Sequence, residues 1–139
     1  MNTRFLTSAI AFAALAVAWL VPVHVDAHHS FAAEFDASKP ITFKGVVTQI
    51  DWANPHVWFY IKVTDEDGHT VRWACEMGAP HQLQGRGWLR DTMKVGDVVT
   101  VEGSLARDGS KRANARAVTT ADGKRLGAAS SGDPATPRQ

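Results

Sequence analysis

The sequence predicts an all-β protein whose single domain is a small five-stranded OB-like Greek-key barrel, with one short helix between its third and fourth strands. Two runs of residues are the basis for this prediction. Apolar and polar residues alternate at 57–63 and again at 71–77, as in strands with a core face and an outer face. Between them lies the acidic turn Asp65–Gly68, whose glycine tolerates positive φ, so the two runs should form an antiparallel hairpin.

The other elements follow from local signals. β-branched or alternating residues predict strands at 41–51, 99–105 and 114–120. Gly-Ala-Pro at 78–80 introduces a short helical segment, which the glycines after Gln84 end. This order of elements is the one expected of a small OB barrel, whereas a sandwich needs more strands.

The first 27 residues read as a cleavable signal peptide. Arg4 precedes an apolar stretch, and the small residue Ala27 closes a site that signal peptidase accepts. A retained membrane anchor is the alternative, because the apolar run approaches the roughly 20 residues of a spanning helix. With cleavage we expect a periplasmic or secreted protein without stable membrane insertion. Three parts would then follow: an N-terminal segment packing on the barrel (28–40), the barrel (41–126) and a disordered tail (127–139).

Charge and cysteine content narrow the classes of partner. The whole chain carries a formal net charge of +1, and removal of the leader leaves 14 basic and 13 acidic residues. This balance provides no basic field, so nucleic acid is not an expected partner. Cys75 is the only cysteine, which rules out an intramolecular disulfide and predicts a buried, inert thiol.

Three motifs resemble those of a family of small secreted bacterial proteins that is a domain of unknown function. They are Ala27-His28-His29-Ser30-Phe31 followed by Glu34-Phe35-Asp36, Asn54-Pro55-His56-Val57-Trp58, and Gly96-Asp97 ahead of Val99-Thr100-Val101-Glu102-Gly103. The similarity runs from about Ala27 to about Arg125. It implies secretion and a compact β domain, and it carries no activity.

The paired histidines His28 and His29 are the leading metal-binding candidates. Cleavage after Ala27 would give His28 a free amine beside its ring nitrogen, a chelate suited to copper. Cleavage one residue earlier would place a histidine third, which also binds Cu(II). His56, at the Asn-Pro turn, is a third candidate ligand that the N-terminal segment can reach. The alternative is that the two histidines form only a solvated end.

A second candidate surface is the outer face of the strand that follows His56. Trp58, Tyr60 and Lys62 share this face, and they could stack on a sugar ring or a partner's peptide. Alternatively, residues 31–35 cover the two aromatic side chains, since exposed aromatic patches are unusual without a partner.

The sequence favours a binding domain over an enzyme, because it contains no established catalytic motif. Acid–base work by a histidine and a carboxylate, with Asp51, Glu76 and Glu102 as candidates, stays open. The expected function is non-enzymatic binding of copper or another divalent metal. The alternative is a metal-free adaptor that recognises a protein or a saccharide through its aromatic strand face.

Overall fold

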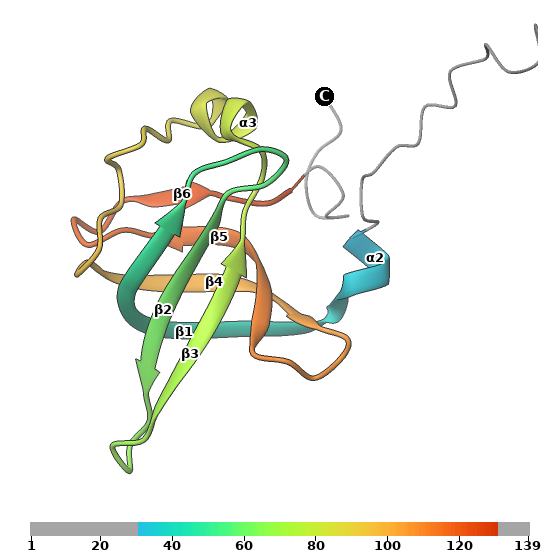
Figure 1. Ribbon diagram of the computed structural model, residues 1–139, viewed down its shortest axis with the longest axis vertical. Coiled ribbons are helices and arrows are strands. Elements are labelled where there is room, and N and C mark those ends of the chain that lie inside the picture. Colours follow the sequence, from blue (N-terminus) through green and yellow to red (C-terminus); the bar gives the residue numbers. More distant parts are fainter. Residues whose placement is uncertain (1–30, 131–139) are drawn as a thin grey trace, which may run out of the picture.

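A computed structural model of the chain describes residues 31–130, which form six strands and two short helices (Figure 1). In chain order these are α2 (Phe31–Glu34), β1 (Phe35–Asp51), β2 (Trp58–Thr64), β3 (Thr70–Glu76), α3 (Pro80–Gly85), β4 (Val98–Ala106), β5 (Arg112–Thr119) and β6 (Arg125–Gly127).

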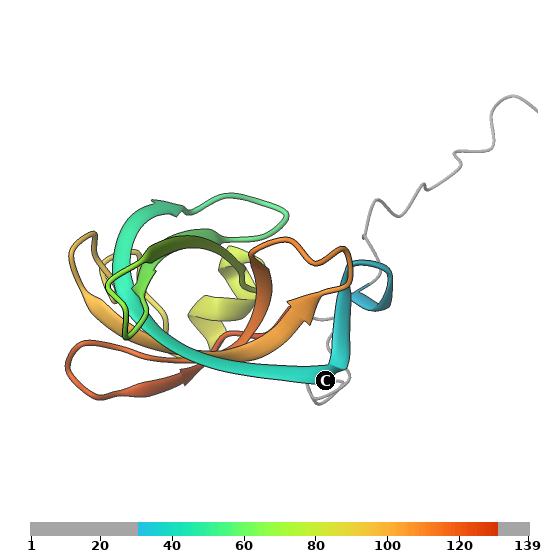
Figure 2. The ribbon, with the colours of Figure 1, turned by 90° about the horizontal axis from the view of Figure 1, so that it is seen from below.

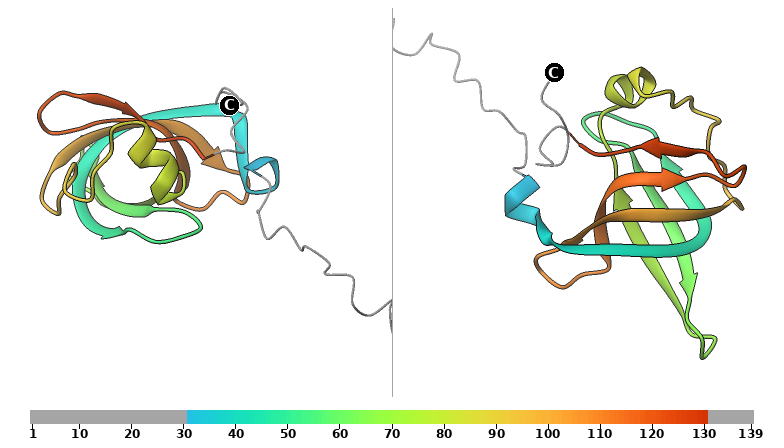
Figure 3. Two further views of the ribbon diagram at one scale, coloured as in Figure 1. Left: turned by 90° about the horizontal axis from the view of Figure 1, so that it is seen from above. Right: turned by 180° about the vertical axis from the view of Figure 1, so that it is seen from behind.

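The strands close into a barrel. β1 pairs with both β2 and β4, β3 pairs with β2, β5 pairs with β4, and a parallel pairing of β3 with β5 completes the ring. Figure 2 looks along this ring, and α3 lies at one end of it (Figure 3). Five strands in this arrangement, with a helix between the third and the fourth, confirm the predicted OB-like fold.

The long strand β1 bends to serve two neighbours. Its first part pairs with β4 and its last part with β2, and Val46 belongs to both registers, opposite Val98 and Lys62. Gly45 lies at this point, where a Cβ would stand 2.6 Å from the backbone oxygen of Lys62. The bend therefore requires a residue without a side chain.

The core lies inside the barrel. It confirms the predicted core face of β2 and of Val57, the residue before that strand. Val57, Phe59 and Ile61 are fully buried. Cys75 is buried too, and burial raises the pKa of its thiol, so it is the inert cysteine the sequence predicts. Trp88, in the segment after α3, is the largest fully buried side chain, and sequence analysis did not single it out.

Three features differ from the sequence prediction. The first strand begins at Phe35, so residues 35–40 belong to the sheet. A sixth strand, β6, pairs with β5 outside the ring. Residues 128–130, expected in a disordered tail, are buried against the barrel. The Trp88 indole Nε1 donates to the Gly127 oxygen at 2.8 Å, which helps to hold the chain there.

The predicted signal peptide and most of the predicted tail fall on residues 1–30 and 131–139, outside the described residues. Within residues 31–130, no helix is long and apolar enough to span a membrane.

Burial predicts how two core substitutions differ. Phe59→Ala should cost about 3–5 kcal/mol, because it removes a fully buried ring and leaves a cavity. Trp73→Ala should cost less, because Trp73 is only half-buried. The substitution removes its stacking on Phe43, with ring centroids 4.8 Å apart, but leaves no enclosed cavity. Urea unfolding of both variants tests this, and an equal or larger loss for Trp73→Ala would contradict the assigned burial.

Candidate functional site

His56 and Glu76 are brought together by the backbone at the start of β2 and the end of β3. Trp58 lies opposite Glu76 in the antiparallel register. One residue earlier, the Val57 N–H donates to the Gly78 oxygen at 3.2 Å, and the Met77 N–H donates to the Val57 oxygen at 2.8 Å. These bonds extend the hairpin beyond β2 and fix the turn, with its cis Asn54–Pro55 bond, against the end of β3.

The His56 Nδ1 atom lies 2.6 Å from Oε1 of Glu76. The Glu76 side chain is 7% exposed and that of His56 is 20% exposed, so the pair is largely withdrawn from water. Burial, and next the neighbouring Glu34 carboxylate, raise the pKa of Glu76 to about 7. The imidazole supplies the hydrogen-bonding partner that a buried carboxyl needs.

Asn114 on β5 extends this polar cluster inward. It is the register partner of Glu76 in the parallel pairing of β3 with β5, and it is fully buried. Its Nδ2 donates to Ser130 Oγ at 3.1 Å and to Glu76 Oε1 at 3.4 Å. Its Oδ1 is a buried atom without a hydrogen-bond partner within residues 31–130. The cluster thus joins the turn before β2, β3, β5 and the segment after β6.

Two opposite charges lie beside this cluster, Glu34 on α2 and Arg112 on β5. Glu34 Oε2 lies 3.5 Å from Arg112 Nη1 at the start of β5. Glu34 acts electrostatically to raise the pKa of Glu76, and Arg112 acts to lower it. The N-terminal helix therefore lies near enough to the His56–Glu76 pair to influence its protonation.

A histidine held by a buried carboxylate is a common arrangement around metal ions. If Nδ1 carries the proton that Glu76 accepts, Nε2 keeps its lone pair and can bind a metal ion. The same pair can also exchange a proton with a bound group. The described residues place no further histidine or cysteine at this pair: within residues 31–130, the only group of three potential metal ligands lies elsewhere.

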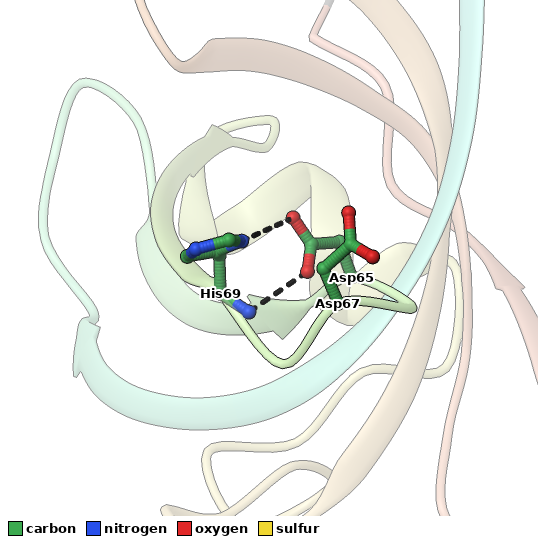
Figure 4. Close-up of side chains that lie close together, drawn as sticks. All are labelled: Asp65, Asp67 and His69. Atoms are coloured by element: carbon green, nitrogen blue, oxygen red, sulfur yellow. Dashed lines mark hydrogen bonds and ion pairs between the residues drawn. The ribbon is translucent and has the colours of Figure 1, made fainter.

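That group is Asp65, Asp67 and His69 in the β2–β3 hairpin (Figure 4). All three are exposed, and the Asp65 carboxylate accepts the His69 backbone N–H at 2.8 Å. Gly68 has φ +84°, as the predicted tight turn requires. The turn accounts for the cluster without a metal ion.

The structure does not bring all the predicted site residues together. His28 and His29 lie outside the described residues. Lys62 is exposed on β2, while Trp58 and Tyr60 are half-buried. Trp58 packs against the cluster of Phe31, Phe35 and Ala106, and the Arg72 guanidinium lies 4.2 Å from the centre of the Tyr60 ring. The aromatic strand face is therefore largely covered by the chain's own side chains.

In the sequence, Glu76 is only one of three candidate carboxylates for acid–base work, and Asn114 is not among the candidates. Both lie on the polar side of their strands, so alternation alone predicts exposed residues. The one usable signal is that Asn114 stands between Ala113 and Ala115, so its amide needs partners where these small residues are buried.

The fold and the site define an OB-like barrel protein with a buried histidine–carboxylate pair near α2. A family model described as a family of unknown function (DUF6152) matches residues 16–115. The chain therefore belongs to this family, which confirms the predicted membership of an uncharacterised family. No similar sequence was found among curated proteins.

A similar solved structure is that of the mitochondrial single-stranded DNA binding protein Rim1 from S. cerevisiae. The identity is 14%, the TM-score is 0.48, and the match covers 59% of this chain and 92% of that one. Nucleic acid was excluded as a partner on the charge balance of the sequence. This exclusion is wrong, because a similar barrel occurs in a DNA-binding protein. At this TM-score the similarity carries no argument about what the present chain binds.

The raised pKa of Glu76 predicts a specific pH dependence of stability. A carboxyl whose pKa is higher in the folded state stabilises the fold fully below its unfolded pKa, near 4.5, and loses that contribution as pH rises through about 7. Glu76→Gln keeps the shape and cannot ionise. From pH 5 to pH 8, the wild type should therefore lose about 1–3 kcal/mol relative to this variant, at about 1.4 kcal/mol per pKa unit.

Urea unfolding of both proteins at the two pH values measures this difference. Glu66→Gln, in the exposed β2–β3 hairpin, is the matched control and should follow the wild type. If Glu76→Gln also follows the wild type at both pH values, Glu76 is not the buried carboxyl described above.

Proposed function

We propose that this protein is an exported, non-enzymatic copper-binding domain in which His28, His29 and His56 supply nitrogen ligands. The observation that carries the proposal is the contact of His56 Nδ1 with the buried Glu76 carboxylate. A carboxylate behind a metal-binding histidine fixes its tautomer and orientation and raises the basicity of the ring.

Chain geometry supports a joint site. His29 precedes Phe31 by two residues, which limits the distance between their Cα atoms to about 7 Å. Phe31 packs in one cluster with Trp58, and Trp58 follows His56 by two residues. The length of chain between His29 and this cluster therefore allows the paired histidines to reach His56. Imidazole and amine nitrogen atoms together match the tetragonal coordination that Cu(II) prefers.

Recognition of a protein or saccharide through Trp58, Tyr60 and Lys62 receives less support. The packing of Trp58 against the strand–helix cluster that includes Phe31, and of Arg72 over Tyr60, leaves little aromatic surface on which a ligand could stack.

Export is the first part of the proposal to test. Cleavage after Ala27 should produce a periplasmic or secreted chain that begins at His28, which intact-mass analysis of that fraction would detect. Recovery of the full-length chain from the membrane fraction would contradict the proposed signal peptide.

Copper binding is tested by titration calorimetry on the mature chain at pH 7.5. We expect about one Cu(II) per chain, with nitrogen ligands visible by electron paramagnetic resonance. One extra residue before His28 should lower the affinity most, because it removes the chelate of amine and ring. His56→Ala should lower it by about 10-fold, because it removes one nitrogen ligand and leaves the chelate of amine and ring in place.

His69→Ala is the matched control, because His69 is an exposed histidine in the separate β2–β3 hairpin. It should bind copper as the wild type does. Binding should weaken below about pH 6.5, since protonated imidazole does not coordinate. Equal, weak binding by all four proteins would show that the paired histidines are only a solvated end.

A further inference from the structure

The first six described residues form a strap across one side of the barrel. We define the strap as Phe31–Asp36, which comprises α2 and the first two residues of β1 (Figure 1). Its two phenylalanines are buried with Ala106 in a small cluster separate from the main core, and Trp58 packs against that cluster. The strap is thus fixed to the barrel through apolar contacts of its own.

The strap is also matched in charge to the β4–β5 hairpin beneath it. Glu34 pairs with Arg112 at 3.5 Å, and Asp36 pairs with Arg107 at 3.7 Å. Arg107 further donates from its backbone N–H to the Glu34 oxygen and from Nε to the Ala32 oxygen, at 2.9 and 2.8 Å. Side-chain charge and backbone hydrogen bonds therefore recognise the strap together.

The strap joins the barrel through a weakly held connection. After Asp36 the pairing of β1 with β4 is interrupted, and it resumes only at Pro40 opposite Ser104. The residues between, 37–39, are exposed. A terminal segment beyond such a break can open without unpairing the rest of the sheet, at a lower free energy than the core of a fold.

We propose that Trp58, Ala106, Arg107 and Arg112 form a docking surface for an acidic peptide segment of a partner protein, which the strap occupies until that segment displaces it. The strap itself displays the chemistry of the occupant: two aromatic side chains four residues apart, with carboxylates at the intervening and following positions. Arginine and tryptophan are also the side chains that most often anchor protein interfaces. This proposal does not rest on the proposed copper binding, and its test contains no metal ion.

The probe is a fluorescein-labelled peptide with the sequence of residues 31–39, and its anisotropy is followed on titration with the exported chain. In the wild type the strap competes from within the same molecule, so the peptide should bind weakly. Glu34→Lys places a cation opposite Arg112 and should loosen the strap, which raises the affinity for the peptide by about 10-fold or more. Phe31→Ala loosens it independently, through its apolar contact.

Both substitutions lie outside the main core cluster, so the barrel should keep its circular dichroism spectrum. Glu66→Lys is the matched control, because it makes the same charge change in the distant hairpin and should bind the peptide as weakly as the wild type. Adding Arg107→Ala to Glu34→Lys should abolish most of the gained affinity. A peptide with lysine in place of both carboxylates should not bind to any of these proteins.

Two results would overturn the proposal. Equal affinity for the acidic and the lysine-substituted peptide would show that the surface does not recognise carboxylates. The Glu34→Lys variant could instead bind an oligothymidylate more tightly than the acidic peptide. This result would assign the arginines and Trp58 to single-stranded nucleic acid, because phosphates and bases bind the same side chains.

Discussion

The short parallel pairing of β3 with β5 is the interaction on which the rest of the structure depends. Only three residue pairs form it, with Cys75 opposite Ala113 at its centre and Glu76 opposite Asn114 at its end. It closes the barrel, so no long strand edge of the ring is left open. It also decides which side chains meet: a shift of one residue would exchange the buried thiol for the carboxyl and place Glu76 in the apolar interior.

The sequence predicted the parts of the fold that local patterns encode. Alternation identified the buried side chains of Phe59 and Ile61, and Gly68 identified the hairpin turn. It could not predict β6, which is only three residues long, or the burial of residues 128–130, because two alanines and a serine resemble a solvated tail. These residues are ordered by distant partners, such as Trp88 bound to Gly127, and no local pattern records such contacts.

The same reasoning separates the parts of the candidate site that were predicted from those that were missed. His56 followed from its place after a proline turn. Glu76 did not, because a period of two tells which face of a strand a side chain occupies and does not tell whether something covers that face. Here His56 contacts Glu76 on the outer face of β3, and the strap packs against Trp58 on the outer face of β2. A polar residue on the outer face of a strand is therefore exposed only where no other part of the chain packs on that face.

Stability alone does not explain a carboxyl at position 76. A buried ion pair or polar network is seldom more stabilising than apolar residues of the same shape, so Glu76 and Asn114 are better explained by what they position. Glu34 connects them to the strap, because it pairs with Arg112 while raising the pKa of Glu76. Displacing the strap would remove one negative neighbour of Glu76 and leave Arg112 without that carboxylate. Both changes favour ionised Glu76, so the strap and the His56–Glu76 pair are electrostatically coupled.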